Sequence, residues 1–198
     1  ERADNLSGRA DQLHYDGRKE VMNLIGNVSI TKDNRTLTSQ AIDYYVPSNT
    51  GKYTSNGRLE DPKNVLTSIV GEYNFNTDNA VFTNNVDLVN SRDNYVIHTN
   101  KLLYNTRTNI AKLVEEAEIT SDENKIITSN GDYNTATEKA NLYVKNGVQP
   151  KLFAKDDRTL EGDTINYDRH TGEGTAIGNV TVNDPKHHAI LTGGYGYH

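Results

Sequence analysis

Apolar and polar residues alternate in short stretches along the whole chain. Val28 and Ile30 flank Ser29, and Val180 and Val182 flank Thr181 in the same manner. A period of two over a short stretch indicates a β-strand with one buried face. No stretch shows the 3.6-residue period of an amphipathic helix. The pattern therefore predicts an all-β protein.

The alternating stretches recur with a regular spacing. An aliphatic residue followed by a Ser/Thr-rich tetrapeptide occurs at intervals of 31, 29, 31, 30, 33 and 30 residues. A unit of about thirty residues cannot bury its apolar face alone, so such units stack on their neighbours. We predict one domain over residues 1–198, made of about six stacked two-strand repeats. The repeats lie near 6–36, 37–65, 66–96, 97–126, 127–159 and 160–189, with a partial repeat at 190–198.

Each unit carries a tyrosine and, in most copies, a Gly/Asn pair. Gly or Asn inside an alternating stretch indicates a bulge or bend rather than the end of a strand. In the fifth copy we expect the strand to run from Leu142 through Asn146-Gly147 to Val148. We expect the tyrosine rings to cap the sheet and their hydroxyls to meet water. The tyrosines are Tyr44, Tyr73, Tyr104, Tyr133, Tyr167 and Tyr197, and the pairs are Gly26-Asn27, Asn56-Gly57, Asn84-Asn85, Asn146-Gly147 and Gly178-Asn179.

Composition excludes several classes of protein. The net charge of −6 is spread over the turns, so there is no basic stripe that would bind a nucleic acid. The chain has no cysteine and therefore neither disulfides nor thiolate metal sites. No apolar run approaches the roughly 18 to 20 residues that span a bilayer, and residues 1–7 lack a signal-peptide pattern. We expect either a cytosolic protein or one whose targeting segment has been removed.

The sequence offers little support for catalysis. It contains no nucleophile elbow, no glycine-rich phosphate loop and no paired-histidine metal motif, so we expect neither an enzyme nor a cofactor. Two alternatives stay open. One is a parallel β-helix enzyme that acts on acidic polysaccharides, and the other is a structural scaffold repeat.

The repeat resembles the OstA-like, or LptA-type, family of periplasmic lipopolysaccharide-transport proteins. The resemblance rests on Ala10-Asp11-Gln12 and Tyr15-Asp16 leading to Gly26-Asn27-Val28, and on Tyr167-Asp168 leading to Gly178-Asn179-Val180. Residues 41–45 leading to Asn56-Gly57 are similar. The resemblance implies an elongated open β-jelly roll whose two sheets face each other across an apolar groove.

The same resemblance implies a non-enzymatic function in lipopolysaccharide or glycolipid transport across the periplasm to the outer membrane. Lipid would lie in the groove and pass between like-folded partners, which join by edge-strand addition at residues 6–15 and 190–197 or form a head-to-tail homo-oligomer. The groove candidates are the inward apolar positions, for which ordinary core packing is the competing interpretation. They are Leu24, Val28, Ile30, Leu59, Phe82, Val86, Leu88, Leu113, Ile119, Leu142, Val144, Val148, Val180 and Val182.

Overall fold

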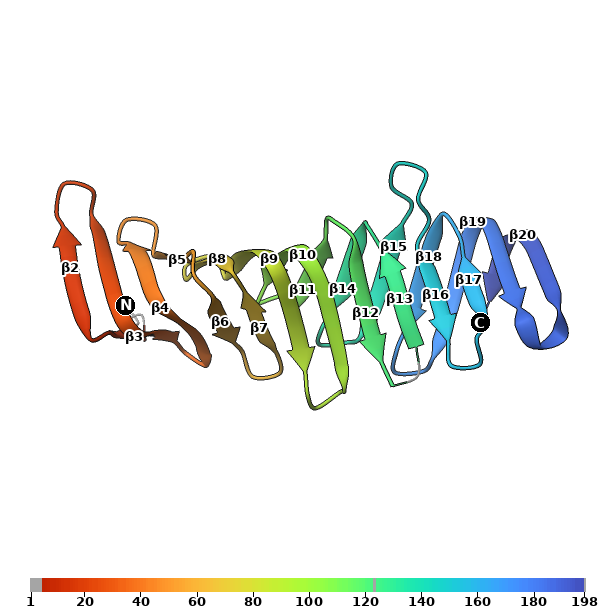
Figure 1. Cartoon of the computed structure of the whole chain (residues 1–198), viewed down its shortest axis with the longest axis horizontal. Helices are drawn as coiled ribbons and strands as arrows, with labels where there is room; N and C mark the ends of the chain where they lie inside the picture. Colours follow the sequence, from red (N-terminus) through yellow and green to blue (C-terminus); the bar gives the residue numbers. More distant parts are fainter. Residues whose placement is uncertain (1–4, 123, 198) are drawn as a thin grey trace.

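The computed structural model describes residues 5–122 and 124–197 as an elongated all-β molecule (Figure 1). Residues 1–4, 123 and 198, which the predicted domain includes, lie outside this description. Within the described residues no helix is long and apolar enough to cross a membrane. A single 3₁₀ turn, η1 (Pro185–His187), joins the last two strands. The strands are β1 (Leu6–Arg9), β2 (Gln12–Asp16), β3 (Val21–Lys32), β4 (Arg35–Tyr45), β5 (Thr50–Tyr53), β6 (Gly57–Glu60), β7 (Val65–Ser68), β8 (Val70–Asn74), β9 (Asn79–Asn90), β10 (Tyr95–Asn105), β11 (Ile110–Leu113), β12 (Ala117–Ser121), β13 (Asn124–Thr128), β14 (Gly131–Asn134), β15 (Lys139–Tyr143), β16 (Lys151–Ala154), β17 (Thr159–Glu161), β18 (Thr164–Asp168), β19 (Glu173–Asp184) and β20 (Ala189–Tyr197).

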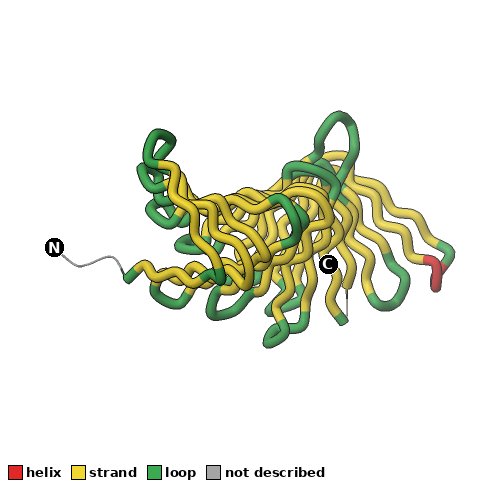
Figure 2. The backbone as a smooth tube through the Cα atoms, turned by 60° about the vertical axis from the view of Figure 1, so that its left-hand side comes forward, coloured by secondary structure: helices red, strands yellow, loops and turns green. Residues whose placement is uncertain are grey.

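The strands lie across the long axis and form two layers, between which the chain passes back and forth (Figure 2). The first layer contains β2, β5, β8, β11, β14, β15 and β18, and the second contains β1, β6, β7, β12, β13, β16 and β17. The long strands β3, β4, β9, β10, β19 and β20 contribute to both layers. Every strand pairing among the described residues is antiparallel, which excludes the parallel β-helix.

The long strands cross from one layer to the other at bends, whereas elsewhere the chain crosses in the connections between short strands, as from β5 to β6. In β3 the bend lies at Gly26 and Asn27, with φ of 78° and 47°, and the register to β4 shifts at this point. In β19 it lies at Gly178 and Asn179, with φ of 76° and 47°. The predicted bends are therefore confirmed at these pairs. Glycine and asparagine tolerate the left-handed backbone that the bends require.

The fifth copy corrects the prediction. There β15 ends at Tyr143, and Asn146 and Gly147, with φ of 53° and 78°, form a tight turn in which Lys145 and Val148 exchange both backbone hydrogen bonds. Asn-Gly is the preferred sequence for such a two-residue hairpin turn. The turn carries Val144 and Val148 to the surface, where they are 37% and 61% exposed. These two residues are therefore not inward positions.

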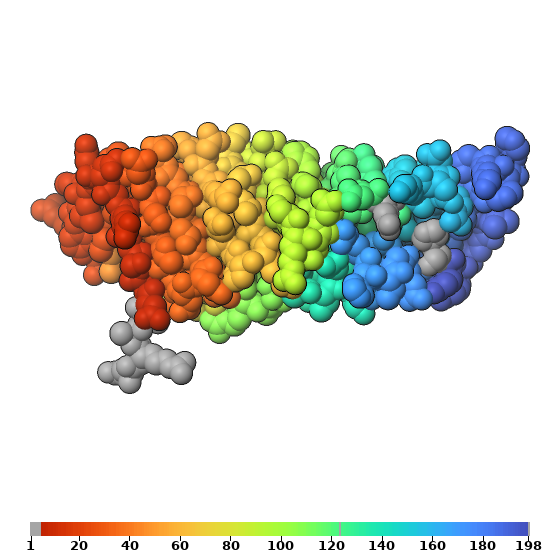
Figure 3. Space-filling view, turned by 90° about the horizontal axis from the view of Figure 1, so that it is seen from below, coloured from red at the N-terminus to blue at the C-terminus, as the bar shows by residue number. Residues whose placement is uncertain are grey.

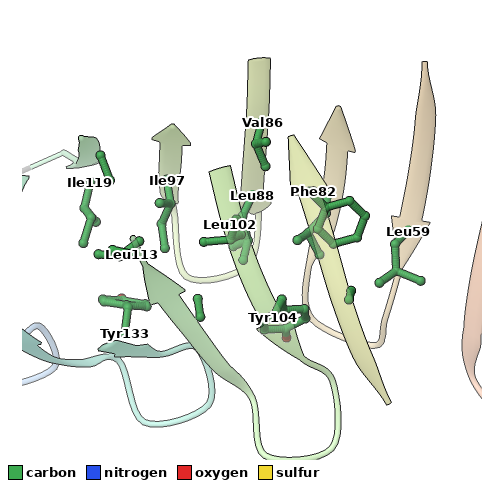
Figure 4. Packing of buried hydrophobic residues seen from close by; sticks show 14 of the residues in the cluster. Leu59, Phe82, Val86, Leu88, Ile97, Leu102, Tyr104, Leu113, Ile119 and Tyr133 are labelled. Atoms are coloured by element: carbon green, nitrogen blue, oxygen red, sulfur yellow. The ribbon is translucent and has the colours of Figure 1, made fainter. Parts of the chain in front are cut away.

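The pairings also correct the expectation of a fully open jelly roll. Ten strands, from β10 round to β19 and back, form a closed hydrogen-bonded ring in the order β10, β11, β14, β15, β18, β19, β17, β16, β13 and β12. Between the layers, side chains such as Phe82, Leu88, Leu102 and Leu113 point toward one another (Figure 4) and are fully buried. The number of repeats stays a prediction.

Candidate functional site

A row of tyrosines runs along the inner face of the first layer. Following the strand register, Tyr73 pairs with Ala80, Ala80 with Tyr104 and Tyr104 with Ala111. The same alternation continues from Tyr44 and Gly51 at one end to Tyr167 and Gly174 at the other. A small residue on every second strand leaves room for the rings on the strands between. The tyrosine–small row therefore fills the interior with aromatic side chains.

Five of the six predicted tyrosines are buried rather than facing water, and only Tyr197, which is 63% exposed, lies at the surface. Tyr73 and Tyr104 are 0% and 2% exposed. The Tyr73 hydroxyl lies 3.0 Å from Thr106 Oγ1, and the Tyr104 hydroxyl donates to Asp61 Oδ2 at 2.8 Å. A buried hydroxyl needs such a partner because leaving it unpaired costs free energy. Tyr104 thus connects the tyrosine row to a turn of the second layer, whereas Tyr73 meets the next turn of its own layer.

The bond between Tyr104 and Asp61 belongs to a polar seam that closes the interior on the side opposite the bends. In the second layer the seam contains Lys32, Arg35, Asp61, Asn64 and Asn124. Lys32 donates to the carbonyl oxygen of Phe75 (2.6 Å), and Arg35 donates to that of Thr106 (3.0 Å). Asp61 accepts from the hydroxyl of Tyr104 (2.8 Å). Asn64 donates to Oγ1 of Thr135 (3.2 Å), and Asn124 donates to the hydroxyl of Tyr167 (2.6 Å).

The seam is staggered along the chain. Its partners stand 43 residues apart in three pairs (Lys32–Phe75, Asp61–Tyr104 and Asn124–Tyr167) and 71 apart in two (Arg35–Thr106 and Asn64–Thr135). A turn of the second layer therefore meets a first-layer turn that lies further along the sequence. On the face shown in Figure 3, the atoms of the middle strands form a continuous surface.

Burial changes the acidity of the tyrosines in the sealed interior. Desolvation raises the pKa of Tyr53, and also that of Tyr73, to about 12, because the charged phenolate is disfavoured away from water. The same cause raises the pKa of Tyr104 and Tyr133 further. These hydroxyls therefore stay protonated over the physiological range.

At the N-terminal end the two layers part and leave an apolar groove, the N-terminal mouth. It has a volume of about 780 Å³. The first-layer turns at this end hydrogen-bond within their own layer, as from Val46 N to Glu20 O and from Asn49 Nδ2 to Asn76 Oδ1. The large apolar residues that line the mouth are Leu6, Leu13, Met22, Leu24, Ile30 and Tyr44.

The mouth is an extension of the core rather than a separate pocket. Leu24, Ile30 and Tyr44 belong to the buried apolar cluster that runs through the molecule, whereas Leu13 is 62% exposed. In the register, Tyr44 pairs with Met22, and Met22 with Tyr15, so a methionine stands where the tyrosine–small row has alanine or glycine elsewhere. An apolar concavity of this kind suits an apolar ligand.

The structure separates the predicted groove residues into four groups. Leu24 and Ile30 line the mouth, while Val144 and Val148 lie on the surface hairpin. Val182 is half-buried against the core. Lipid contact stays a prediction for all of the inward positions. The remaining ones are packed in the interior, at most 4% exposed: Val28, Leu59, Phe82, Val86, Leu88, Leu113, Ile119, Leu142 and Val180.

The sequence reasoning missed Leu6, Leu13, Met22 and the seam. One signal for the tyrosine–small row was present, because Gly51, Ala80, Ala111, Ala140 and Gly174 each follow a tyrosine of the row by seven residues. Met22 follows Tyr15 by the same interval and breaks the rule. The seam has no comparable signal, because its partners lie far apart in the sequence.

The two ends of the molecule present edge strands. At the C-terminal end β20 pairs with β19 on one side, and Ile190, Leu191 and Tyr195 are 70%, 63% and 63% exposed. At the N-terminal end β1 and β2 pair with β3. Unpaired backbone donors and acceptors of an edge strand can accept a strand from another chain. Among the described residues, no group of three or more His, Cys, Asp or Glu side chains is arranged to hold a metal ion.

Comparisons with known proteins give one family. A family model described as OstA-like protein matches residues 1–96 and again residues 89–154. One similar solved structure is the crystal structure of LptH, the LptA homologous periplasmic component of the lipopolysaccharide transport device from Pseudomonas aeruginosa. That chain is 14% identical with a TM-score of 0.47, and the match covers 51% of the present chain and 76% of LptH. No match is found among the curated proteins.

Proposed function

The chain belongs to the OstA-like protein family, and from this premise we propose that it is a periplasmic carrier of lipopolysaccharide or a related glycolipid. Acyl chains lie in the N-terminal mouth and make only apolar contacts there. The protein holds and hands on the lipid without a cofactor and without catalysis. Other jelly-roll components of the transport chain join it at the edge strands β1, β2 and β20.

One observation carries the proposal: the apolar concavity at the end of an otherwise filled interior. Leu13 on β2 lies beside Leu24 on β3 in the first layer, and these two residues, Met22 and the second-layer residue Leu6 line a groove of about 780 Å³. Burying apolar ligand surface contributes roughly 25 cal/mol per Å². A groove that leaves Leu13 62% exposed to water therefore gains stability when an acyl chain covers it.

The filled middle supports a second candidate function, a scaffold repeat that spans a distance without carrying lipid. From β4 to β18 the interior is occupied by the protein's own side chains, and Phe82, Leu102 and Leu113 are 0% exposed. A close-packed interior of this kind has no space for a ligand. The two functions differ in one respect, which is whether the mouth is occupied by lipid.

A photo-crosslinking experiment distinguishes the two. The photoreactive residue p-benzoylphenylalanine replaces Met22 in the mouth, Phe82 in the filled middle, or Val81 on the outer face, where the side chain is 38% exposed. Each variant is exposed to lipopolysaccharide, irradiated and examined by immunoblot. We expect lipid adducts at Met22 and none at Phe82 or Val81.

Adducts that are absent at Met22, while a known lipopolysaccharide-binding protein is labelled in the same preparation, would contradict the carrier and favour the scaffold. Adducts at both Met22 and Phe82 would mean that lipid enters the middle of the interior. Equal labelling at Val81 would reveal non-specific capture, and the carrier would lose its support.

A further inference from the structure

We infer that a polar groove on the outside of the molecule binds the saccharide part of the glycolipid whose acyl chains lie in the N-terminal mouth. This inference rests on the proposed function. The groove has a volume of about 660 Å³ and lies beside the bends of β3, β4 and β9 and the outer face of β6 and β7. Asn27 lines both this groove and the mouth, so the two concavities meet at that residue.

The groove runs along the long axis, across the strands. Its outer-face side follows the register from Ser29 to Thr38, Arg58 and Thr67 on β3, β4, β6 and β7. Its other side consists of bend residues such as Gln40 and Asn56. Adjacent strands lie about 4.8 Å apart, so the groove from β3 to β9 is about 19 Å long. This length accommodates an extended oligosaccharide that leaves the mouth.

Its polar groups are available to a ligand. Within the described part of the chain, no hydrogen bond is formed by the side chains of Ser29, Gln40, Asn56, Thr67 and Asn85. The hydroxyl and amide groups of these side chains both donate and accept hydrogen bonds, as sugar hydroxyls do. A saccharide is therefore a better match than an apolar ligand, which would leave these groups unpaired.

The charge of the groove also favours a saccharide over a strongly anionic ligand. Arg58 is the one cationic side chain in the lining, and its guanidinium lies 3.2 Å from the carboxylate of Glu60. Two exposed charges of opposite sign nearly cancel in the field that a ligand meets. A nucleic acid would need a run of unpaired cations instead.

Hydrogen bonds to water compete with those to a sugar, so the saccharide alone binds weakly. Attachment to the acyl chains changes this, because a ligand held in the mouth presents its saccharide to the groove at a high effective concentration. The groove therefore increases the affinity for a glycolipid with an extended saccharide and does not affect a lipid whose saccharide is too short to reach it.

The test compares two probes: lipid A, which has a short saccharide, and rough lipopolysaccharide, which carries the core oligosaccharide as well. The test variant combines Ser29→Ala, Gln40→Ala and Thr67→Val. The matched control is Thr181→Val, which removes a half-exposed threonine hydroxyl from the same outer face at the other end of the molecule. We expect the triple variant to lose about tenfold in affinity for rough lipopolysaccharide and nothing for lipid A, and the control to lose neither.

Each other result overturns the inference. An unchanged affinity of the triple variant for rough lipopolysaccharide removes the groove from binding but leaves the mouth as the lipid site. Equal losses for both probes place the effect in the mouth or the fold. If the unaltered protein binds neither probe, the proposed function itself fails. A photo-crosslinker at Thr67 supplies a second readout, because it should label the saccharide only, whereas one at Thr181 should remain unlabelled.

Discussion

The N-terminal mouth and the filled middle of this molecule, from β4 to β18, have the same strand pattern but different interiors. In the middle, Tyr73 and Tyr104 flank Ala80, and the Tyr104 hydroxyl meets a turn of the second layer. In the mouth, Tyr15 and Tyr44 flank Met22, and Tyr15 is 49% exposed. Alternating apolar residues thus make either a core or a groove. Contacts between the layers decide which.

The largest expected difference between the regions is in the cost of removing an apolar side chain. Phe82→Ala leaves a cavity in a close-packed interior and should lower the free energy of unfolding by about 3–5 kcal/mol. Leu13→Ala, in the mouth, removes a side chain that is already 62% exposed and should change it by less than about 0.5 kcal/mol. Urea denaturation measures both. Similar losses for the two variants would contradict the contrast.

Alkaline pH should lower the free energy of unfolding through the buried tyrosines of the filled middle. Burial raises the pKa of Tyr53 and Tyr73 to about 12, while an unfolded tyrosine titrates near 10. Below pH 10 both states are protonated, and their contribution to stability is complete. Between about pH 10 and 12 the unfolded chain loses protons that the folded chain keeps, so stability falls by about 1.4 kcal/mol per pH unit for each tyrosine.

The variant Tyr53→Phe should therefore show a shallower loss of stability across this pH range than the unaltered protein. Urea midpoints at pH 9, 10 and 11 test the slope, with Tyr15→Phe in the mouth as the control. A slope that Tyr53→Phe leaves unchanged would show that this tyrosine is not protected from solvent.

Replacing a small residue of the filled middle by a larger one should destabilise the protein. A Cβ at Gly71 would lie 2.3 Å from Cζ of the buried Tyr53, so Gly71→Ala should displace the ring and cost about 1–3 kcal/mol. A Cβ at Gly8, on β1 beside the mouth, would meet no atom closer than 3.8 Å. Gly8→Ala should leave the thermal midpoint unchanged or raise it slightly, and a marked fall would show that the mouth is tighter than it appears in the structure.

The smallest effect concerns the seam. Tyr104→Phe removes the donor to Asp61, but that carboxylate keeps the backbone N–H groups of Lys63 and Asn64, so we expect a loss of about 1 kcal/mol. The buried hydroxyl of Tyr133 has no hydrogen-bond partner among the described residues. Tyr133→Phe should therefore be neutral or stabilising in the same urea assay. A larger loss for Tyr133→Phe than for Tyr104→Phe would contradict this interpretation of the seam.

The strands, the bends at Gly26-Asn27 and Gly178-Asn179 and the edges could be predicted because each depends on residues close in the sequence. The alternation of apolar residues predicts the wrong side for Val144 and Val148. In that copy Asn146-Gly147 forms a hairpin turn instead of a bend within a strand. The filled interior depends on the cross-strand register and on contacts such as that between Asp61 and Tyr104, 43 residues apart, which a local pattern does not reveal.

The stagger of the seam has a mechanical consequence. Because second-layer turns meet first-layer turns further along the chain, the first layer overhangs at the N-terminal end and the second layer overhangs at the C-terminal end. At each end, therefore, one layer extends beyond the other and forms a step. A like-folded module added at either end would contact two offset surfaces rather than one flat face. A junction of this form would resist bending and twisting, so a row of such modules would behave as a stiff rod.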